Sequence, residues 1–206
     1  IEAGAADDLV GDAGAHELLF EHSRLRVGSV EDRDVTPPVL GGVVHAMAGA
    51  RVGHNQIATN TLISLGSQVR GKRCRPYGSD MKIRVIIQGN VRFYYPDVSV
   101  ICNSNPPDEL FQDKPVVIIE VLSKSTRRTD NGEKMDAYLT IESLQAYVLI
   151  EQEVPFAIVF RRAGAGFERE VYEGLDAVIA LPEIDARLAL ADVYEGVEFV
   201  AEPDEE

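Results

Sequence analysis

Several patterns are scarce in this 206-residue chain, and each scarcity excludes a class of protein. The two cysteines, Cys74 and Cys102, are isolated and show no C-x-x-C or Cys/His spacing, which argues against a zinc site and favours a reducing compartment. We expect both to be small core residues. No apolar run approaches the roughly 20 residues that span a bilayer, and the N-terminal stretch lacks the features of a signal peptide. A cytoplasmic protein with no membrane partner is therefore expected.

Positive charge is also scarce, because 20 basic residues face 34 acidic ones and give a formal net charge of −14. Taken alone, this discourages a nucleic-acid partner, since phosphate binding needs a positive surface. The acids are concentrated at the two ends: residues 1–37 hold 9 acids and 3 bases, and residues 137–206 hold 16 acids and 4 bases. Residues 72–136, in contrast, carry 11 bases and 9 acids. The central region is therefore mildly basic, while a solvated surface explains the acidic ends.

The length suits one domain that can build a core without disulfides or structural metals. We predict that residues 1–37 form a poorly specified acidic leader, that residues 38–200 form the folded domain, and that residues 201–206 form a frayed acidic tail.

Apolar periodicity predicts the elements of that domain. Strands are expected at 39–47, 81–85, 93–102, 115–122, 146–151, 156–162 and 167–173, with a hairpin turn at 163–166. Helices are expected at 54–70, 129–141 and 186–195. Gly71 should end the first helix, and Thr129 or Asp130 should cap the second, with Glu133 completing a capping box. This order describes a mixed sheet flanked by helices.

The most informative residue is Glu120, which interrupts the apolar run of Pro115–Leu122. A strand of this kind is buried on both faces, where an unpaired carboxylate is costly. Glu120 therefore needs a cation, a basic side chain or a cluster of hydrogen-bond donors. If Asp97, next to Pro96, lies on the neighbouring strand, the two carboxylates converge and suit a hard divalent ion.

A third residue completes a chemical pattern, because Lys134 lies at the start of the helix that follows. Phosphodiester hydrolysis requires an activated water, charge neutralisation on the phosphate and a stabilised leaving oxygen. Asp97 and Glu120 can hold one or two divalent ions, and Lys134 can orient the water or offset charge in the transition state. The competing interpretation of Glu120 is a buried salt bridge to Lys82, Arg84 or Lys134.

These residues belong to a longer set of motifs that together resemble a known family. The set comprises Gly42–Ala50, His54-Asn55, Ser79–Arg84, Tyr95-Pro96-Asp97, Ile119–Ser123, Ser125-Thr126, Gly132–Lys134 and Tyr138. Over residues 39–195 it is similar to the Uma-type restriction endonuclease family of the PD-(D/E)XK nuclease superfamily.

The resemblance implies a restriction-endonuclease-like αβββαβ core: an α/β fold with a mixed central sheet, flanking helices and additional C-terminal antiparallel strands. It implies magnesium-dependent cleavage of nucleic acid, with manganese as a substitute and DNA favoured over RNA as the expected substrate, by a homo-oligomer expected to be a dimer. Asp97 and Glu120 are then metal ligands. Leu122 occupies the usual lysine position of the E-x-K motif, so the catalytic lysine is assigned to Lys134, with Lys124 ranked second.

Other polar residues have accessory or structural interpretations. His54 and Asn55 open the first helix, where many superfamily members carry an acid; they can cap the helix or contact a metal through water, and capping is favoured. Asp80 is an accessory candidate, although a structural role is preferred. Arg127 and Arg128 could meet phosphates or form a solvated loop.

Three functions follow from these observations. The favoured hypothesis is a metal-dependent endonuclease. The second is a catalytically silent binding or regulatory module that keeps the fold, motivated by the acidic surface and by the missing acid on the first helix. The third is a phosphoesterase acting on a smaller substrate, because a strongly negative protein repels long polyanions at low salt.

Overall fold

The computed structural model describes residues 51–123 and 132–199, together with the backbone of 39–40 and 43–44. The expected leader over 1–37, the expected tail over 201–206 and Lys124 lie outside these residues, so the predicted domain boundaries stay a prediction. Within the described part of the chain, no helix has the length and apolar character needed to cross a membrane.

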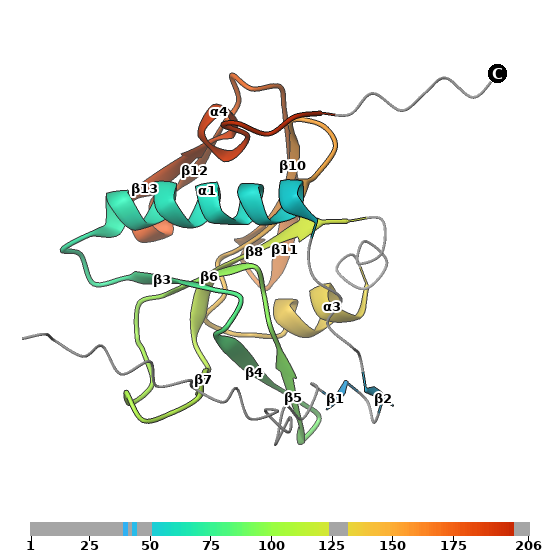
Figure 1. Ribbon diagram of the computed structural model, residues 1–206. Coiled ribbons are helices and arrows are strands. Elements are labelled where there is room, and N and C mark those ends of the chain that lie inside the picture. Colours follow the sequence, from blue (N-terminus) through green and yellow to red (C-terminus); the bar gives the residue numbers. More distant parts are fainter. Residues whose placement is uncertain (1–38, 41–42, 45–50, 124–131, 200–206) are drawn as a thin grey trace, which may run out of the picture. The chain divides into compact units, whose positions relative to one another are not determined.

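A six-stranded mixed sheet forms the centre of the domain (Figure 1). Its strands, in spatial order, are β11 (Gly166–Glu173), β10 (Phe156–Ala163), β9 (Ala146–Glu151), β8 (Pro115–Leu122), β6 (Val98–Ile101) and β3 (Arg75–Gly78). Strands β8 and β9 are parallel, and the chain between them contains helix α3 (Glu133–Leu139). All other neighbouring pairs in this sheet are antiparallel.

The order α1–β3–β6–β8–α3–β9 is the expected αβββαβ core, and β10 and β11 are the expected additional antiparallel strands. The predicted fold class is therefore confirmed.

Strand β8 is buried on both faces, as its unbroken Val/Ile sequence predicts. Val117, Ile119 and Val121 belong to one apolar cluster, whereas Ile118 and Leu122 belong to the other. The first cluster lies on the α1 side of the sheet and the second on the α3 side. Glu120 shares its face with the second cluster by the alternation of side chains along a strand.

Helix α1 (Val52–Val69) matches the predicted helix closely. It buries Ile57, Leu65 and Val69 and contacts the sheet on one side and strand β13 with helix α4 on the other (Figure 1). Gly71 follows the helix with φ +77°, a left-handed conformation that glycine adopts without a steric cost. The prediction that Gly71 ends the helix is confirmed.

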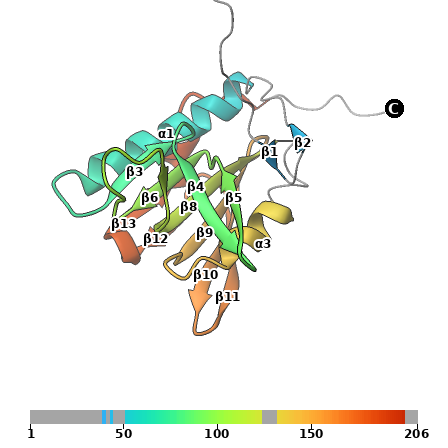
Figure 2. The ribbon, with the colours of Figure 1, turned by 90° about the horizontal axis from the view of Figure 1, so that it is seen from below.

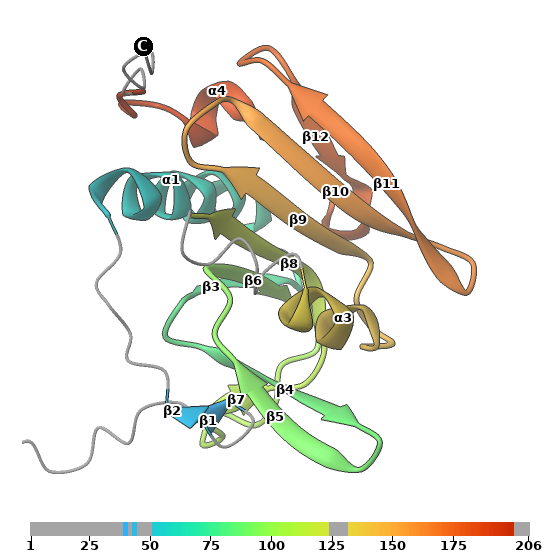
Figure 3. The ribbon, with the colours of Figure 1, turned by 90° about the vertical axis from the view of Figure 1, so that its right-hand side faces the viewer.

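A second, three-stranded sheet consists of β5 (Asn90–Tyr94), β4 (Lys82–Ile87) and β7 (Phe111–Gln112), in that order. It covers the face of the main sheet that α1 leaves open, because Ile83 and Val85 of β4 join the α3-side cluster (Figure 2). Strands β4 and β5 form a projecting hairpin (Figure 3). Its two turn residues, Gln88 and Gly89, both have positive φ, as a tight two-residue hairpin turn of type I′ requires.

The expected single strand over 93–102 is wrong, because it is divided between the two sheets. Strand β5 ends at Tyr94 and β6 begins at Val98, so Asp97 lies just before β6 instead of within a strand. Pro96 explains the break, since proline lacks the N–H group that a sheet ladder needs. The short strands β3 and β7 are additions that the sequence pattern did not predict.

The C-terminal part also differs from the expectation of a helix over 186–195. Strand β12 (Val178–Leu181) and strand β13 (Ala186–Ala189) form an antiparallel pair linked by a 3-10 turn, η1 (Pro182–Ile184). Helix α4 covers only Leu190–Val193. In the region where a strand with an early Gly-Gly bend was expected over 39–47, the structure has two short antiparallel strands, β1 (Val39–Leu40) and β2 (Val43–Val44). Residues 41–42 and 45–47 lie outside the described residues.

The predicted cap of the second helix by Thr129 or Asp130 falls on residues outside the described part of the chain. Helix α3 begins after Gly132, which provides no side-chain cap. Glu133, the other member of the expected box, accepts a hydrogen bond of 2.8 Å from Nη1 of Arg92 on β5. Its side chain therefore connects α3 to the neighbouring hairpin.

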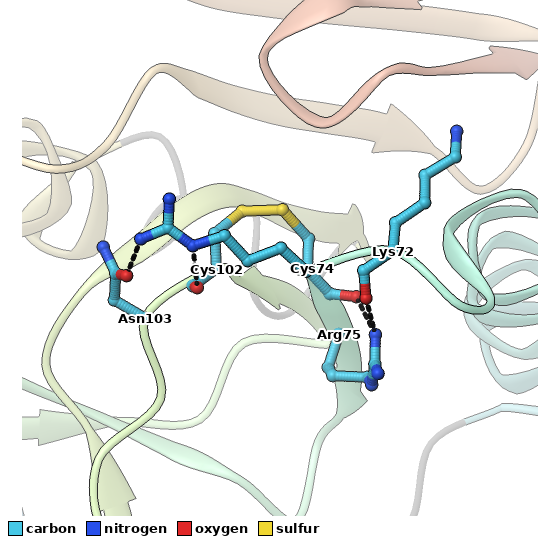
Figure 4. The surroundings of a disulfide bond; sticks show 6 residues. Lys72, Cys74, Arg75, Cys102 and Asn103 are labelled. Atoms are coloured by element: carbon cyan, nitrogen blue, oxygen red, sulfur yellow. Dashed lines mark hydrogen bonds between the residues drawn. A yellow bond between two sulfur atoms is a disulfide. The ribbon is translucent and has the colours of Figure 1, made fainter.

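The two cysteines are paired in a disulfide between the ends of β3 and β6 (Figure 4). The register of these strands places Arg75 opposite Ile101, so Cys74 and Cys102 are the next opposing residues. Cys74 is buried and contributes to the core, as expected. The interpretation of the cysteines as isolated is wrong, however, and they give no support for a reducing compartment.

Candidate active site

Asp97 is held from two directions where the chain enters β6. Its Oδ2 accepts a hydrogen bond of 2.7 Å from the backbone N–H of Val121, and its Oδ1 lies 3.0 Å from Nε2 of His54. His54 is in the first turn of α1, and the side chains of His54 and Asp97 are only 13% and 17% exposed. The carboxylate is therefore fixed between helix α1 and strand β8.

Glu120 lies in the middle of β8 with a side chain that is 2% exposed. Its Oε1 lies 3.1 Å from Nζ of Lys134 and 3.3 Å from Oη of Tyr138, which donates a hydrogen bond to it. Lys134 and Tyr138 are four residues apart on α3 and therefore lie on the same face of the helix. This arrangement supplies a positive charge and a hydrogen-bond donor to a carboxylate in an apolar interior.

The strand register brings the two acids next to each other. Val98 of β6 is paired with Ile119 of β8 in an antiparallel ladder. One residue further along, Asp97 precedes β6 beside the Glu120 segment of β8, and its Oδ2 accepts the hydrogen bond from the N–H of Val121. The backbone therefore brings the two residues close together. The predicted convergence of their carboxylates on one cation stays a prediction.

The donor set fits a hard divalent cation that keeps part of its water shell. Within residues 51–123 and 132–199, no group of three or more His, Cys, Asp or Glu side chains forms a ready-made metal cage. Magnesium, however, is commonly held by one or two carboxylates, with water and substrate phosphate as the other ligands. Each carboxylate oxygen has more than one lone pair, so the hydrogen bonds at Asp97 and Glu120 do not exhaust their capacity to accept a cation.

Of the three basic residues considered as partners of Glu120, the structure brings Lys134 to it. Lys82 instead lies over the ring of Phe93, with Nζ 4.8 Å from the ring centroid. Arg84 forms a bidentate pair with Asp113, both contacts being 2.8 Å. The hydrogen bond to Asp113 raises the pKa of Arg84 and keeps it charged.

The accessory candidates have different outcomes. The favoured capping role of His54 is wrong, because α1 has Arg51 as its N-cap without a side-chain cap, and His54 contacts Asp97 instead. Asp80 is exposed in the turn between β3 and β4, and no hydrogen bond or ion pair among the described residues joins it to this site. Lys124 lies outside the described residues, as do Arg127 and Arg128.

Tyr138 is the site residue that sequence reasoning missed, because its helical spacing indicated only a core side chain. The i, i+4 spacing from Lys134 was the available signal. A second contact runs from the same helix to β5, where the ring of Tyr138 meets that of Tyr94 edge-on at 5.4 Å. Tyr94 also donates a hydrogen bond of 3.4 Å to Glu133. Helix α3 thus contacts β8 through Lys134 and Tyr138, and it contacts β5 through Glu133 and Tyr138.

The elements α1, β3, β6, β8, α3 and β9 of the main layer, with Asp97 just before β6 and Glu120 on the neighbouring β8, define a restriction-endonuclease-like fold. A solved structure described as "a putative nuclease belonging to DUF820 from Anabaena variabilis ATCC 29413" has the same fold. The superposition has a TM-score of 0.61 at 21% sequence identity and covers 77% of this chain and 89% of that chain.

The particular family is identified by sequence. The family model "Uma2: Putative restriction endonuclease" matches residues 21–191, and this chain belongs to that family. This confirms the family that the sequence motifs indicated.

Two similar proteins come from Synechocystis sp. (strain ATCC 27184 / PCC 6803 / Kazusa). "Uncharacterized protein sll1609" is 32% identical over 116 residues, which span 55% of this chain and 64% of that protein. "Uncharacterized protein slr1290" is 28% identical over 160 residues, which span 77% of this chain and 83% of that protein.

Proposed function

We propose that this protein is a magnesium-dependent endonuclease that hydrolyses phosphodiester bonds in DNA. Asp97 and Glu120 are its metal ligands, and Lys134 is its catalytic lysine. Manganese is expected to replace magnesium. The family and the fold support the nuclease class, and the side chains around Glu120 support the particular assignment.

The observation that carries the proposal is the placement of a fully buried Glu120 close to Asp97 and within 3.1 Å of Lys134. A buried ion pair kept only for stability could be replaced, both partners together, by apolar residues at little cost. Glu120 lies close to a second acid, Asp97, where α1 and α3 both approach the sheet. This position favours a catalytic role for Glu120. His54 and Tyr138 then hold the two carboxylates in place.

The residues have distinct roles in hydrolysis. When bound, the ion supplies Lewis-acid stabilisation of the phosphate and a water that ionises near neutral pH. Asp97 keeps its orientation because the N–H of Val121 and the ring of His54 contact different oxygens. Lys134 can offset the charge that develops on the phosphate or orient the attacking water. The apolar surroundings of Glu120 strengthen these electrostatic interactions.

Substrate, assembly and location are further parts of the proposal. DNA is the proposed substrate and the cytoplasm the proposed location, in keeping with the family of restriction endonucleases. A homodimer is proposed because β11, an eight-residue strand, forms one edge of the main sheet and has a strand partner on one side only among the described residues. Exposed edges of this kind can pair with another chain. Analytical ultracentrifugation tests the dimer directly.

Cleavage of supercoiled plasmid DNA in magnesium or manganese tests the proposal. The wild-type protein should convert the plasmid to open-circular or linear forms, and EDTA should abolish this. Asp97→Ala, Glu120→Gln and Lys134→Ala should each lower the rate by at least about a hundredfold, the range seen when a principal electrostatic group is removed. Asp108→Ala, which changes an exposed acid in a loop, is the matched control. Full cleavage by the Asp97 and Glu120 variants would exclude the assignment.

A catalytically silent binding module is the second candidate, because Lys134 already neutralises Glu120. Such a pair can keep the fold stable without any metal. Titration calorimetry with magnesium separates the two functions. A silent module should bind no magnesium, whereas the endonuclease should bind it and lose the binding in Glu120→Gln.

A further inference from the structure

The segment that joins α1 to β3 is strongly basic in a protein whose formal net charge is −14. Residues 70–75 have the sequence Arg-Gly-Lys-Arg-Cys-Arg, with four basic residues and no acid. All four basic side chains are exposed, whereas Cys74 is buried. A short run with this density of Lys and Arg is typical of contacts with polyanions. We call residues 70–75 the basic loop.

The backbone of the basic loop is fixed at both ends. It begins with a tight turn after α1, closed by a hydrogen bond of 3.0 Å from Lys72 N–H to the carbonyl of Val69. Gly71 provides the left-handed conformation in this turn. It ends at the disulfide between Cys74 and Cys102, beside the ladder of β3 and β6 (Figure 4).

The arginine side chains are ordered by uncharged partners. Arg73 donates from Nε to the carbonyl of Cys102 at 3.0 Å and from Nη2 to the side-chain oxygen of Asn103. Arg75 donates from Nη1 to the carbonyls of Lys72 and Cys74 (Figure 4). Because these acceptors carry no formal charge, the contacts do not offset the positive charge of either guanidinium group. Their remaining N–H groups are held in an orientation that can meet a phosphate.

Few acids oppose this charge. Among the described residues, Asp185 pairs with Lys72 at 2.6 Å, and no carboxylate forms an ion pair with Arg70, Arg73 or Arg75. A fifth base, the exposed Arg187, lies next to the end of α1, because its backbone exchanges hydrogen bonds with the side chain of Gln68.

We propose that the basic loop binds the phosphate backbone of duplex DNA at a distance from the cleavage site, an inference that rests on the proposed nuclease function. From His54 to Arg70, α1 spans about 24 Å at 1.5 Å per residue. This length corresponds to about seven base pairs of duplex, at 3.4 Å for each phosphate of a strand. Helix α1 itself contains no acidic residue, although Asp192 of α4 lies beside it, with Oδ2 3.5 Å from Oγ of Ser64.

Fluorescence anisotropy with a labelled 20-base-pair duplex tests this contact. Asp97→Ala serves as the background so that the DNA is not cut, and EDTA is present throughout. The triple change Arg70→Gln, Arg73→Gln and Arg75→Gln should weaken binding at least about tenfold at low salt. It should also reduce the slope of log K against log salt by two to three, since each lost phosphate contact lowers it by about one.

Two further variants separate charge from local structure. Arg169→Gln changes one exposed base on β11 and should leave both affinity and slope close to those of the background. Replacing Arg73 and Arg75 with lysine keeps the charge and should restore most of the slope. Circular dichroism of the triple variant should match the background, and a matched spectrum with unchanged affinity and slope overturns the proposal.

The remaining outcomes distinguish the loop from the nuclease function. Cleavage by wild-type protein, combined with unchanged DNA binding in the triple variant, rejects the basic loop and leaves the endonuclease intact. A reduced slope without cleavage by the wild-type protein supports the loop and rejects the nuclease function. Absence of DNA binding overturns the loop proposal. Loss of binding to phosphatidylserine vesicles alone, with DNA binding unchanged, also overturns it and assigns the loop to a membrane surface.

Discussion

Glu120 and Lys134 form an ion pair of 3.1 Å in which the carboxylate is 2% exposed and the lysine side chain 16% exposed. They come from different elements, β8 and α3, so the pair also attaches the helix to the main sheet. Tyr138 adds a hydrogen bond to the same carboxylate oxygen. Removing one charge leaves the other in a poorly solvated position and should destabilise the fold. The ion pair can therefore be tested through the free energy of unfolding, without any assay of cleavage.

Lys134→Met should lower the free energy of unfolding by about 3 to 5 kcal/mol, because the carboxylate of Glu120 loses the positive charge 3.1 Å from its Oε1 while it remains buried. Glu120→Gln should cost less, since it removes the buried negative charge. The double variant should recover much of the loss, giving a large coupling energy. Urea denaturation in EDTA measures all three, with the exposed Lys114→Met as control. A Lys134→Met protein as stable as the control contradicts this prediction.

His54→Ala should raise the magnesium concentration for half-maximal cleavage by about tenfold, because residues that orient metal ligands usually affect metal affinity by that factor or more. It removes the partner 3.0 Å from Oδ1 of Asp97 and leaves the hydrogen bond from Val121 in place. His54→Gln should restore part of the affinity. The adjacent exposed Asn55→Ala is the control, and a magnesium response identical in all four proteins rules out a positioning role.

The fold was predictable from the sequence where side-chain burial alone decides the structure. Strand β8 has the predicted bounds, because its apolar residues are buried on both faces. The pattern failed for β3, where Pro76, Tyr77 and Gly78 show no alternation and none is fully buried, so the pairing with β6 defines this strand. Missing β3 also concealed the disulfide, because the opposition of Cys74 and Cys102 depends on the register of β3 with β6.

The candidate site was predictable for residues whose local sequence is unusual. Glu120 stands out because it interrupts an apolar strand, and Asp97 stands out beside Pro96. His54 and Tyr138 appear in the family motif set, but their local sequence does not show which side chain each would contact, because both also fit their helices as ordinary residues. Their roles arise from how the helices pack on the sheet, which the sequence pattern does not determine.

The stability of the C-terminal strands should depend on pH through two acids that share Arg161. Hydrogen bonds from Arg161 lower the pKa of Glu170 below its ordinary value of 4.5, whereas burial raises the pKa of Glu183 above it. Ionised Glu170 therefore adds stability that is lost as pH falls below 4.5. Glu183 has the opposite effect, because its protonated form is favoured in the folded state and stability declines as pH rises through 4.5.

Glu170→Gln should accordingly flatten the decrease in melting temperature below pH 4.5, and Glu183→Gln should remove the decline above it. Melting temperatures measured from pH 3 to 7 give both slopes. Glu168→Gln, a neighbouring exposed acid on β11, is the control. Parallel curves for wild type and both variants contradict the assignment of these two pKa shifts.

Reduction of the disulfide should lower the free energy of unfolding by about 3 to 4 kcal/mol, because Cys74 and Cys102 are 28 residues apart and the bond restricts that loop in the unfolded chain. The double variant Cys74→Ser and Cys102→Ser should show the same loss without reductant. Urea midpoints with and without TCEP measure the effect on the wild type, and the variant should not respond to TCEP. Two titratable thiols in wild-type protein that was unfolded without reductant would show that the cysteines are unpaired and that the basic loop lacks this attachment.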